Sequence, residues 1–348
     1  MHPQAAYRAP SSTLRIIETN PRQADADGVV WIAAFSWAGV AGQRLWRAAG
    51  RQYGMVAALA MGGLLLGAVY HLMGQTRPIE AYGSGLIFGL ALGLIMAVAR
   101  EVGRQTVGMS NVMGRGRYPV IGAAPELTPQ ALRELPPNER NGLGAVLRQP
   151  ASAFATAYRD LQSVIENQQM LAVIGAGPNE GATTTALALA VAATQVGRRV
   201  IVVDCDVQRR ALTQLIDHQV EHGVLDVAES PERWRDVVVQ ETESGLDVLP
   251  AGRIRNPWRT LFDAPGFAIL LNDLRAQYDL VVLDCPPAMS ADGSQIARRA
   301  DHCIIVATWD ETPVSALNEA VRSLGWIKPE KASLFLNRVP AQFRFRRA

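Results

Sequence analysis

Two long apolar runs near the N-terminus constrain this chain more than any other feature of its sequence. Residues 54–73 contain no charged side chain if His71 is neutral, and residues 81–99 contain none at all. Each run matches the roughly 20 residues that a helix needs to cross about 30 Å of hydrocarbon. The connection between them is short and contains Pro78. We therefore expect a transmembrane helical hairpin over residues 53–100, with a buried helical hairpin of a soluble protein as the alternative.

Arginines flank this hairpin unevenly. The connection holds only Arg77, whereas seven arginines lie just outside the two runs: Arg44, Arg47, Arg51, Arg100, Arg104, Arg115 and Arg117. Because cytoplasmic flanks of membrane helices are enriched in Lys and Arg, we expect both termini in the cytoplasm. Small residues in the runs, Gly63, Gly67, Gly85, Gly89 and Gly93, would let the helices pack closely, within one chain or between chains.

The rest of the chain divides by composition. Residues 1–52 are expected to be a cytoplasmic tail, with an interfacial helix over its apolar stretch 28–42, which is too short to span a bilayer. Residues 101–150 are rich in Pro and Gly and are expected to be a linker. With 49% hydrophobic residues and a net charge of +2, the chain is neither disordered nor a nucleic-acid binder that works by bulk electrostatics.

The C-terminal part, residues 151–340, is expected to be an α/β domain. A helix over 151–169 leads into it, and apolar runs then alternate with helical patterns. The expected strands are Leu171–Ile174, Val200–Val203, Leu246–Leu249, Leu280–Leu283, Cys303–Ala307 and Leu334–Leu336. Continuous apolar strands separated by helices favour a doubly wound, mainly parallel sheet that is covered on both faces.

A glycine-rich turn follows the first of these strands. Residues 175–185 read GAGPNEGATTT and lead into a strongly helical stretch. Aligned on the phosphate-loop pattern GxxxxGK[ST], Gly181 takes the second glycine place and Thr183 the hydroxyl place. Such a loop surrounds phosphates with backbone N–H groups, and its hydroxyl reaches Mg²⁺. The match is partial, because Ala182 stands where the phosphate-binding lysine belongs and Ala176 where the first glycine belongs.

Two strands of the domain end in aspartates. Asp204 closes the second strand, and Asp206 follows on the same side of the pleat. Asp284 closes another apolar strand, an arrangement that holds Mg²⁺ through water in phosphate-loop proteins. We expect all three carboxylates in the active centre, with Thr183, Asp204 and Asp284 associated with Mg²⁺. A plain helix-capping role for the aspartates is the alternative, and so is a dinucleotide-binding turn in which Asp204 contacts a ribose.

In combination these segments resemble a family: the bacterial tyrosine kinases of capsule and exopolysaccharide assembly, relatives of the deviant-Walker partition ATPases. The resemblance covers roughly residues 146–339. It is carried by AYRDL at 157–161, PNEGATT at 178–184, DCDVQRR at 204–210, DCPP at 284–287 and FLNR at 335–338. Upstream, YPVIGAAP at 118–125 is similar to a juxtamembrane motif of the polysaccharide co-polymerases.

The resemblance implies a ligand, a location and partners. ATP or ADP with Mg²⁺ would be bound by Gly177, Pro178, Asn179, Glu180, Gly181, Ala182, Thr183, Thr184, Asn337 and Arg338, with Asn337 reading adenine unless it is only a turn residue. The chain would lie in the bacterial inner membrane beside polysaccharide polymerase and export proteins, and would be able to self-associate. The basic tail 341–348 carries three arginines interleaved with two phenylalanines. This pattern allows contact with anionic lipid, but we favour a solvated terminus.

Two departures from the family limit its expected activity. Ala182 replaces the loop lysine, and the only lysines of the chain are Lys328 and Lys331. The family's C-terminal tyrosine cluster is missing, since no tyrosine follows Tyr278. We therefore expect a catalytically impaired scaffold or regulator of polysaccharide synthesis and export.

Two alternatives to this function stay open at the level of the sequence. The first is an active ATPase or tyrosine autokinase in which Arg209 or Arg210 replaces the lysine. The second is a membrane-tethered dinucleotide-binding protein, as the partial GxGxxG pattern of the turn would allow.

Overall fold

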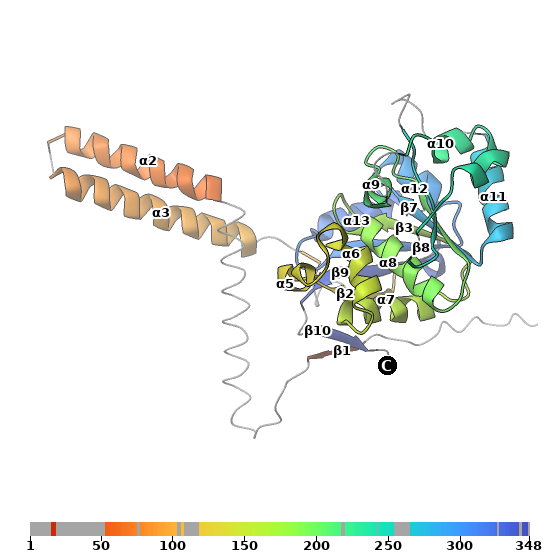
Figure 1. Cartoon of the computed structure of the whole chain (residues 1–348). Coiled ribbons are helices and arrows are strands. Elements are labelled where there is room, and N and C mark those ends of the chain that lie inside the picture. The colour runs from red at the N-terminus through yellow and green to blue at the C-terminus, as the bar shows by residue number, and fades with distance from the viewer. Residues whose placement is uncertain are drawn as a thin grey trace, which may run out of the picture. The chain divides into compact units, whose positions relative to one another are not determined.

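The computed structural model (Figure 1) describes most of the chain as two compact units. One unit, residues 20–105, contains an apolar hairpin, and the other, residues 1–19 and 106–348, contains an α/β domain. The described residues are 15–18, 53–74, 77–102, 106–107, 118–216, 220–241, 243–253, 265–325, 327–340 and 343–346.

The apolar hairpin consists of α2 (Tyr53–Leu72) and α3 (Pro78–Val102), which lie side by side (Figure 1). By length and composition, both helices are able to cross a membrane. Glycines form the seam between them: a Cβ atom on Gly63 would overlap the carbonyl group of Gly85, and one on Gly85 would overlap that of Gly63. The small residues therefore serve close packing within one chain, one of the two roles expected from the sequence.

The α/β domain is built on an eight-stranded sheet with the order β2-β9-β8-β3-β7-β4-β6-β5. All neighbours are parallel except β5 and β6. The strands are β2 (Val120–Pro125), β3 (Met170–Gly175), β4 (Val200–Asp204), β5 (Val239–Gln240), β6 (Asp247–Leu249), β7 (Leu280–Cys285), β8 (His302–Thr308) and β9 (Ala332–Val339). The expected doubly wound, mainly parallel fold is confirmed, and all six expected strands are present.

Each face of the sheet carries its own hydrophobic core, which explains why the strands are apolar throughout. In β3, Met170, Ala172 and Ile174 belong to one core, and Leu171 and Val173 to the other. Helices cover both faces (Figure 1). They are α5 (Pro129–Arg133), α6 (Gly142–Arg148), α7 (Ala153–Val164), α8 (Ala182–Gln195), α9 (Ala211–Ile216), α10 (Val224–Val227), α11 (Phe267–Gln277), α12 (Ala291–Ala297) and α13 (Val314–Ser323), with short 3₁₀ turns η1 (Pro137–Glu139), η2 (Pro231–Asp236) and η4 (Pro329–Lys331).

The α/β domain begins earlier in the chain than its composition suggested. Residues 118–150, expected to be linker, contain β2, α5, η1 and α6, and β2 adds a parallel strand beside β9. Tyr118 is buried, and its hydroxyl donates to the carbonyls of Leu324 and Ile327, both at 3.3 Å. Prolines and glycines are typical of linkers, but an edge strand tolerates them because only one side of it must pair. The helix expected over 151–169 is also shorter, since α7 ends at Val164.

The two ends of the chain pair with each other. β1 (Arg15–Glu18) and β10 (Phe343–Arg346) form a two-stranded antiparallel sheet in which Ile16 lies opposite Phe345. The segments expected to be a loose tail and a solvated terminus therefore contain strands. The interfacial helix expected over 28–42 lies outside the described residues.

Candidate nucleotide-binding site

The glycine-rich turn lies at the carboxyl end of β3 and leads directly into α8. Asn179 and Gly181 adopt left-handed backbone conformations, with φ of 64° and 86°, and Gly181 is the N-cap of the helix. The N–H groups of the first turn of a helix have no partner within the helix, and the helix dipole makes this end partly positive. The local geometry is therefore that of an anion site at a helix N-terminus.

The side chains of Glu180, in the loop itself, and of Asn337, in β9, hold the loop in this shape. The Oε2 atom of Glu180 accepts hydrogen bonds from the Thr308 N–H at 2.8 Å and the Thr312 hydroxyl at 2.6 Å. Asn337, which is buried at the end of β9, donates from Nδ2 to the Glu180 carbonyl at 3.0 Å. Asn337 thus braces the loop in this structure, and its contact with adenine stays a prediction. The bracing role of Glu180 was not expected, because its partners are more than 120 residues away in the sequence.

A cavity of about 340 Å³ lies over the loop and the start of α8. It is lined by Gly175, Gly177, Asn179, Glu180, Gly181, Ala182, Thr183, Thr184, Asp206, Arg209, Ala211, Cys285, Pro287 and Arg338. Most of the binding residues expected from the sequence are therefore brought together. Pro178 and Asn337 do not line the cavity, and Asp204 and Asp284 are buried outside its lining.

The buried aspartates meet because their strands are neighbours. Parallel pairing of β4 and β7 puts Asp204 in register with Asp284. Oδ2 of Asp204 accepts from the Thr213 N–H at 2.9 Å and from the Thr213 hydroxyl at 2.7 Å, which also fits the helix-positioning alternative. Its Oδ1 atom and both carboxylate oxygens of Asp284 are buried and have no hydrogen-bond partner among the described residues.

Burial and mutual repulsion shift the pKa values of two carboxyl groups in this cluster. Burial raises the pKa of Asp204 to about 6, and the charge of Asp206 adds to the shift while the bonds from Thr213 oppose it. Burial also raises the pKa of Asp284 well above its usual value; Asp204 adds to this shift, and the Thr183 hydroxyl opposes it. Unpaired buried carboxylate oxygens beside a threonine hydroxyl fit a divalent cation.

The side chains alone do not complete a Mg²⁺ site, as is usual for phosphate loops. Among the described residues, no group of three His, Cys, Asp or Glu side chains is arranged to hold a metal ion by itself. Mg²⁺ in such sites keeps several waters and arrives with the phosphates of the nucleotide, so that the protein adds a threonine hydroxyl and an aspartate. Thr183, Asp204 and Asp284 are the residues that would hold it here.

Two arginines supply the positive charge in the cavity lining. Arg209 lies with its Nε atom 3.8 Å from Oδ2 of Asp206, and Arg338 comes from β9. Arg210, which the sequence also offered in place of the lysine, does not line the cavity, and its buried Nε atom has no partner among the described residues. Both lysines line a separate cavity beside Cys303.

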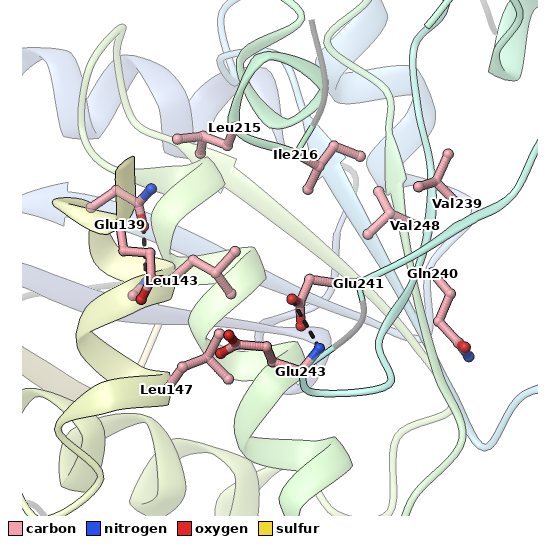
Figure 2. Close-up of a pocket in the computed structure, with 12 residues that line it drawn as sticks. Glu139, Leu143, Leu147, Leu215, Ile216, Val239, Gln240, Glu241, Glu243 and Val248 are labelled. Carbon is pink, nitrogen blue, oxygen red and sulfur yellow. Dashed lines mark hydrogen bonds between the residues drawn. The ribbon is translucent and has the colours of Figure 1, made fainter. Parts of the chain in front are cut away.

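Cavity volume alone does not identify the nucleotide-binding site. A second cavity, of about 380 Å³, lies among α6, the end of α9 and the β5–β6 edge of the sheet (Figure 2). Its lining combines apolar side chains such as Leu143 and Ile216 with the carboxylates of Glu139, Glu241 and Glu243. Arg148 pairs with Glu139 and Glu243, and the described lining residues include no basic side chain, whereas the loop cavity offers N–H groups and guanidinium groups.

Comparisons with known proteins agree with this geometry. The AAA domain family matches residues 170–333. The succinoglycan biosynthesis transport protein ExoP of Rhizobium meliloti is 25% identical over 203 residues, which are 56% of this chain and 26% of ExoP. The tyrosine-protein kinase YwqD of Bacillus subtilis is 27% identical over 198 residues, 55% of this chain and 84% of YwqD. The α/β domain is homologous to bacterial tyrosine kinases.

Solved structures show the same fold. The kinase domain of the Escherichia coli tyrosine kinase ETK superposes with a TM-score of 0.56 at 22% identity, over 64% of this chain and 91% of that domain. The chain spans about a quarter of the length of longer relatives such as ExoP. The resemblance to bacterial tyrosine kinases read from the sequence is thereby confirmed.

Proposed function

We propose that the α/β domain binds ATP or ADP with Mg²⁺ in the cavity over α8, and that the chain acts as a catalytically impaired scaffold or regulator of exopolysaccharide synthesis and export. The observation that carries this proposal is a braced phosphate loop with Ala182 in the place of the lysine. Buried carboxylates with unpaired oxygens stand beside that loop.

Binding and catalysis depend on the missing lysine to different degrees. Phosphoryl transfer is catalysed mainly by positioning and by neutralising charge that develops on the phosphates, so loss of a phosphate-bound cation lowers the rate strongly. Binding rests on more contacts, including the N–H groups of the loop, Mg²⁺ and the base. We therefore expect measurable affinity with little hydrolysis.

The tyrosines of the domain also argue against autophosphorylation. Tyr118, Tyr158 and Tyr278, the three tyrosines of the α/β domain, are all buried. The Tyr278 hydroxyl donates to Oδ2 of Asp247 at 2.8 Å. A neighbouring chain could not phosphorylate Tyr118 or Tyr158 without unfolding this one, and phosphorylation of Tyr278 would break its bond with Asp247. Acceptors would have to lie elsewhere, as Tyr53 does at the start of α2, where it is exposed.

The cellular setting follows from the hairpin and from the relatives. α2 and α3 suit a membrane anchor, and ExoP is named for succinoglycan biosynthesis and transport. We infer a place in the bacterial inner membrane, with both termini and the α/β domain in the cytoplasm. The partners would be polysaccharide polymerase and export proteins, together with further copies of this chain.

The test uses the full chain in lipid nanodiscs. Calorimetry with ATP, ADP and NAD, each with and without Mg²⁺, measures binding, while phosphate release and a phosphotyrosine blot measure activity. We expect Mg²⁺-dependent binding of ADP and ATP, little hydrolysis and no phosphotyrosine. Tighter binding of NAD than of ADP would favour the dinucleotide alternative, and strong phosphotyrosine on the wild-type chain would refute the impaired kinase.

The variant Ala182→Lys sharpens this test. Residue 182 begins α8, so a lysine there can fold back over bound phosphates. A charge-assisted contact is worth roughly 1.5–3 kcal/mol, so ATP affinity should rise about tenfold or more. If the turn has no phosphate ligand, the new lysine will leave affinity unchanged in a protein that remains folded.

A further inference from the structure

We propose that Arg338 takes the place of the missing loop lysine as the cation that contacts the phosphates. The inference rests on the proposed nucleotide binding and gives Arg338, which the resemblance names only among the nucleotide-binding residues, the role of the lysine. Few positive charges are available to a bound phosphate. Ala182 replaces the loop lysine, both lysines line a separate cavity, and the only basic groups among the described lining residues of the loop cavity are guanidinium groups.

Arg338 lies in β9, lines the cavity and has a backbone conformation that is unusual in a strand. It is the one exposed residue of β9, whose other residues are all buried. Its φ is 54°, in the left-handed region that costs a residue with a side chain about 1 kcal/mol or more. The Arg338 N–H donates to Oδ1 of Asn337 at 2.9 Å, which stabilises this conformation. A strained residue next to the last position of β9 thus takes one arginine out of the sheet's core and puts it in the cavity lining.

The side chain reaches the loop itself. Its Nη2 atom lies 3.4 Å from the carbonyl oxygen of Asn179, at the left-handed turn of the phosphate loop. Its Nη1 atom lies 3.2 Å from Oε2 of Glu311, in an ion pair whose side chains are 43% and 39% exposed. The guanidinium group is therefore held at the loop by a solvent-accessible carboxylate, a partner that phosphate oxygens can replace.

Arg209, the other arginine in the lining, contacts the carboxylate of Asp206. Its Nε atom lies 3.8 Å from Asp206, and its backbone N–H donates to Oδ1 of the same residue at 3.2 Å. It also offsets the negative charge around the buried Asp284. Both guanidinium groups have a carboxylate partner, but the partner of Arg209 belongs to the acidic cluster of the cavity, whereas Glu311 is not among the described residues of the cavity lining; we therefore assign the phosphate contact to Arg338.

An arginine in this role differs from a lysine in chemistry as well as in position. Its planar guanidinium group can donate two parallel hydrogen bonds to phosphate oxygens. Because it approaches from β9 and not from the start of α8, it can hold the phosphates without reproducing the placement of the lysine. This would secure binding while leaving phosphoryl transfer weak.

The experiment compares five variants of the full chain, one of them Ala182→Lys alone, in nanodiscs by calorimetric titration with Mg²⁺-ADP and Mg²⁺-ATP. Arg338→Gln removes the charge, and Glu311→Gln removes the competing carboxylate. Arg233→Gln is the matched control, an exposed arginine of η2 paired with Asp236. The fifth variant combines Ala182→Lys with Arg338→Gln. Thermal unfolding without nucleotide checks that each variant is folded.

We expect Arg338→Gln to weaken ATP binding about tenfold or more, and the control to leave it within about twofold. Glu311→Gln should tighten binding a few-fold. Ala182→Lys should raise affinity by a larger factor in the Arg338→Gln background than in the wild-type chain, because both cations serve the same phosphates.

Three results would overturn the inference. Unchanged affinity in a folded Arg338→Gln variant would refute it while leaving the proposed nucleotide binding intact. Fully additive effects of the lysine and glutamine substitutions would show that Arg338 does not act in the lysine's place. No binding of either nucleotide by the wild-type chain would refute the proposed function, and this inference with it.

Discussion

Replacing Gly181 by alanine tests whether the phosphate loop is held as the structure shows it. Two effects combine at this position. The backbone is left-handed, with φ of 86°, and a Cβ atom there would overlap the Nδ2 atom of Asn337. That nitrogen donates the 3.0 Å hydrogen bond to the Glu180 carbonyl, so the new methyl group must displace the brace of the loop.

The expected loss of stability follows from these two effects. A left-handed conformation costs an alanine roughly 1–2 kcal/mol relative to glycine. Displacing Asn337 breaks its hydrogen bond and leaves buried polar groups unpaired, which costs about 1–3 kcal/mol more. We expect Gly181→Ala to lower the free energy of unfolding by about 2–5 kcal/mol. For a domain of this size, each kcal/mol corresponds to roughly 2–4 °C in melting temperature.

Gly197→Ala is the matched control. Gly197 has nearly the same φ, 84°, but a Cβ atom there would meet nothing within 4 Å. It should therefore show only the backbone cost of roughly 1–2 kcal/mol. A double variant with Asn337→Ala isolates the collision: removing the Asn337 amide should relieve it, so the double variant should be less destabilised than the sum of the two single variants.

The assay is thermal and urea-induced unfolding of the full chain in nanodiscs, combined with titration of Mg²⁺-ADP. Gly181→Ala should also weaken ADP binding by about tenfold or more, because the displaced loop no longer presents its N–H groups. If Gly181→Ala were no more destabilising than Gly197→Ala, or if its effect simply added to that of Asn337→Ala, the bracing of the loop by Asn337 would be refuted.

Three further predictions concern the membrane, the acidic cluster and pH. A cysteine at Gln75 should react with an impermeant reagent from outside the cytoplasmic membrane and one at Asn111 should not, since arginines are enriched on the flanks; the opposite pattern would reverse the topology. Asp284→Asn should raise the melting temperature of the nucleotide-free protein at pH 7 while abolishing the effect of Mg²⁺ on ADP binding, because burial disfavours this carboxylate; a lower melting temperature would contradict this. Burial lowers the pKa of His302 to about 4, so between about pH 6.5 and 4 the unfolded chain binds more protons than the folded one, and the free energy of unfolding falls as the pH drops. In urea-unfolding curves, His302→Gln should weaken this dependence of the free energy of unfolding on pH. An unchanged dependence would exclude this histidine as its source.

Local patterns in the sequence were sufficient for the framework of the molecule. The apolar runs near the N-terminus predicted α2 and α3, and continuous apolar segments predicted six of the eight strands of the main sheet. The glycine-rich segment between β3 and α8 predicted the loop. These features are encoded within 20 or so consecutive residues, where length, hydropathy and glycine content determine the backbone that can form.

Contacts between distant segments could not be read in this way. Residues 118–150 look like a linker, yet β2 joins the sheet because β9 leaves an edge to which a parallel strand can pair. Likewise, the sequence offered Arg209 and Arg210 as substitutes for the lysine, but only the fold shows that Arg209 and Arg338, and not Arg210, line the cavity. Asn337 and Glu180, 157 residues apart, meet only because β9 and the loop after β3 end at the same edge of the sheet. Parallel pairing joins strands that are far apart in the sequence, so the choice of neighbours depends on the packing of the whole domain and leaves no periodic signal in any one segment.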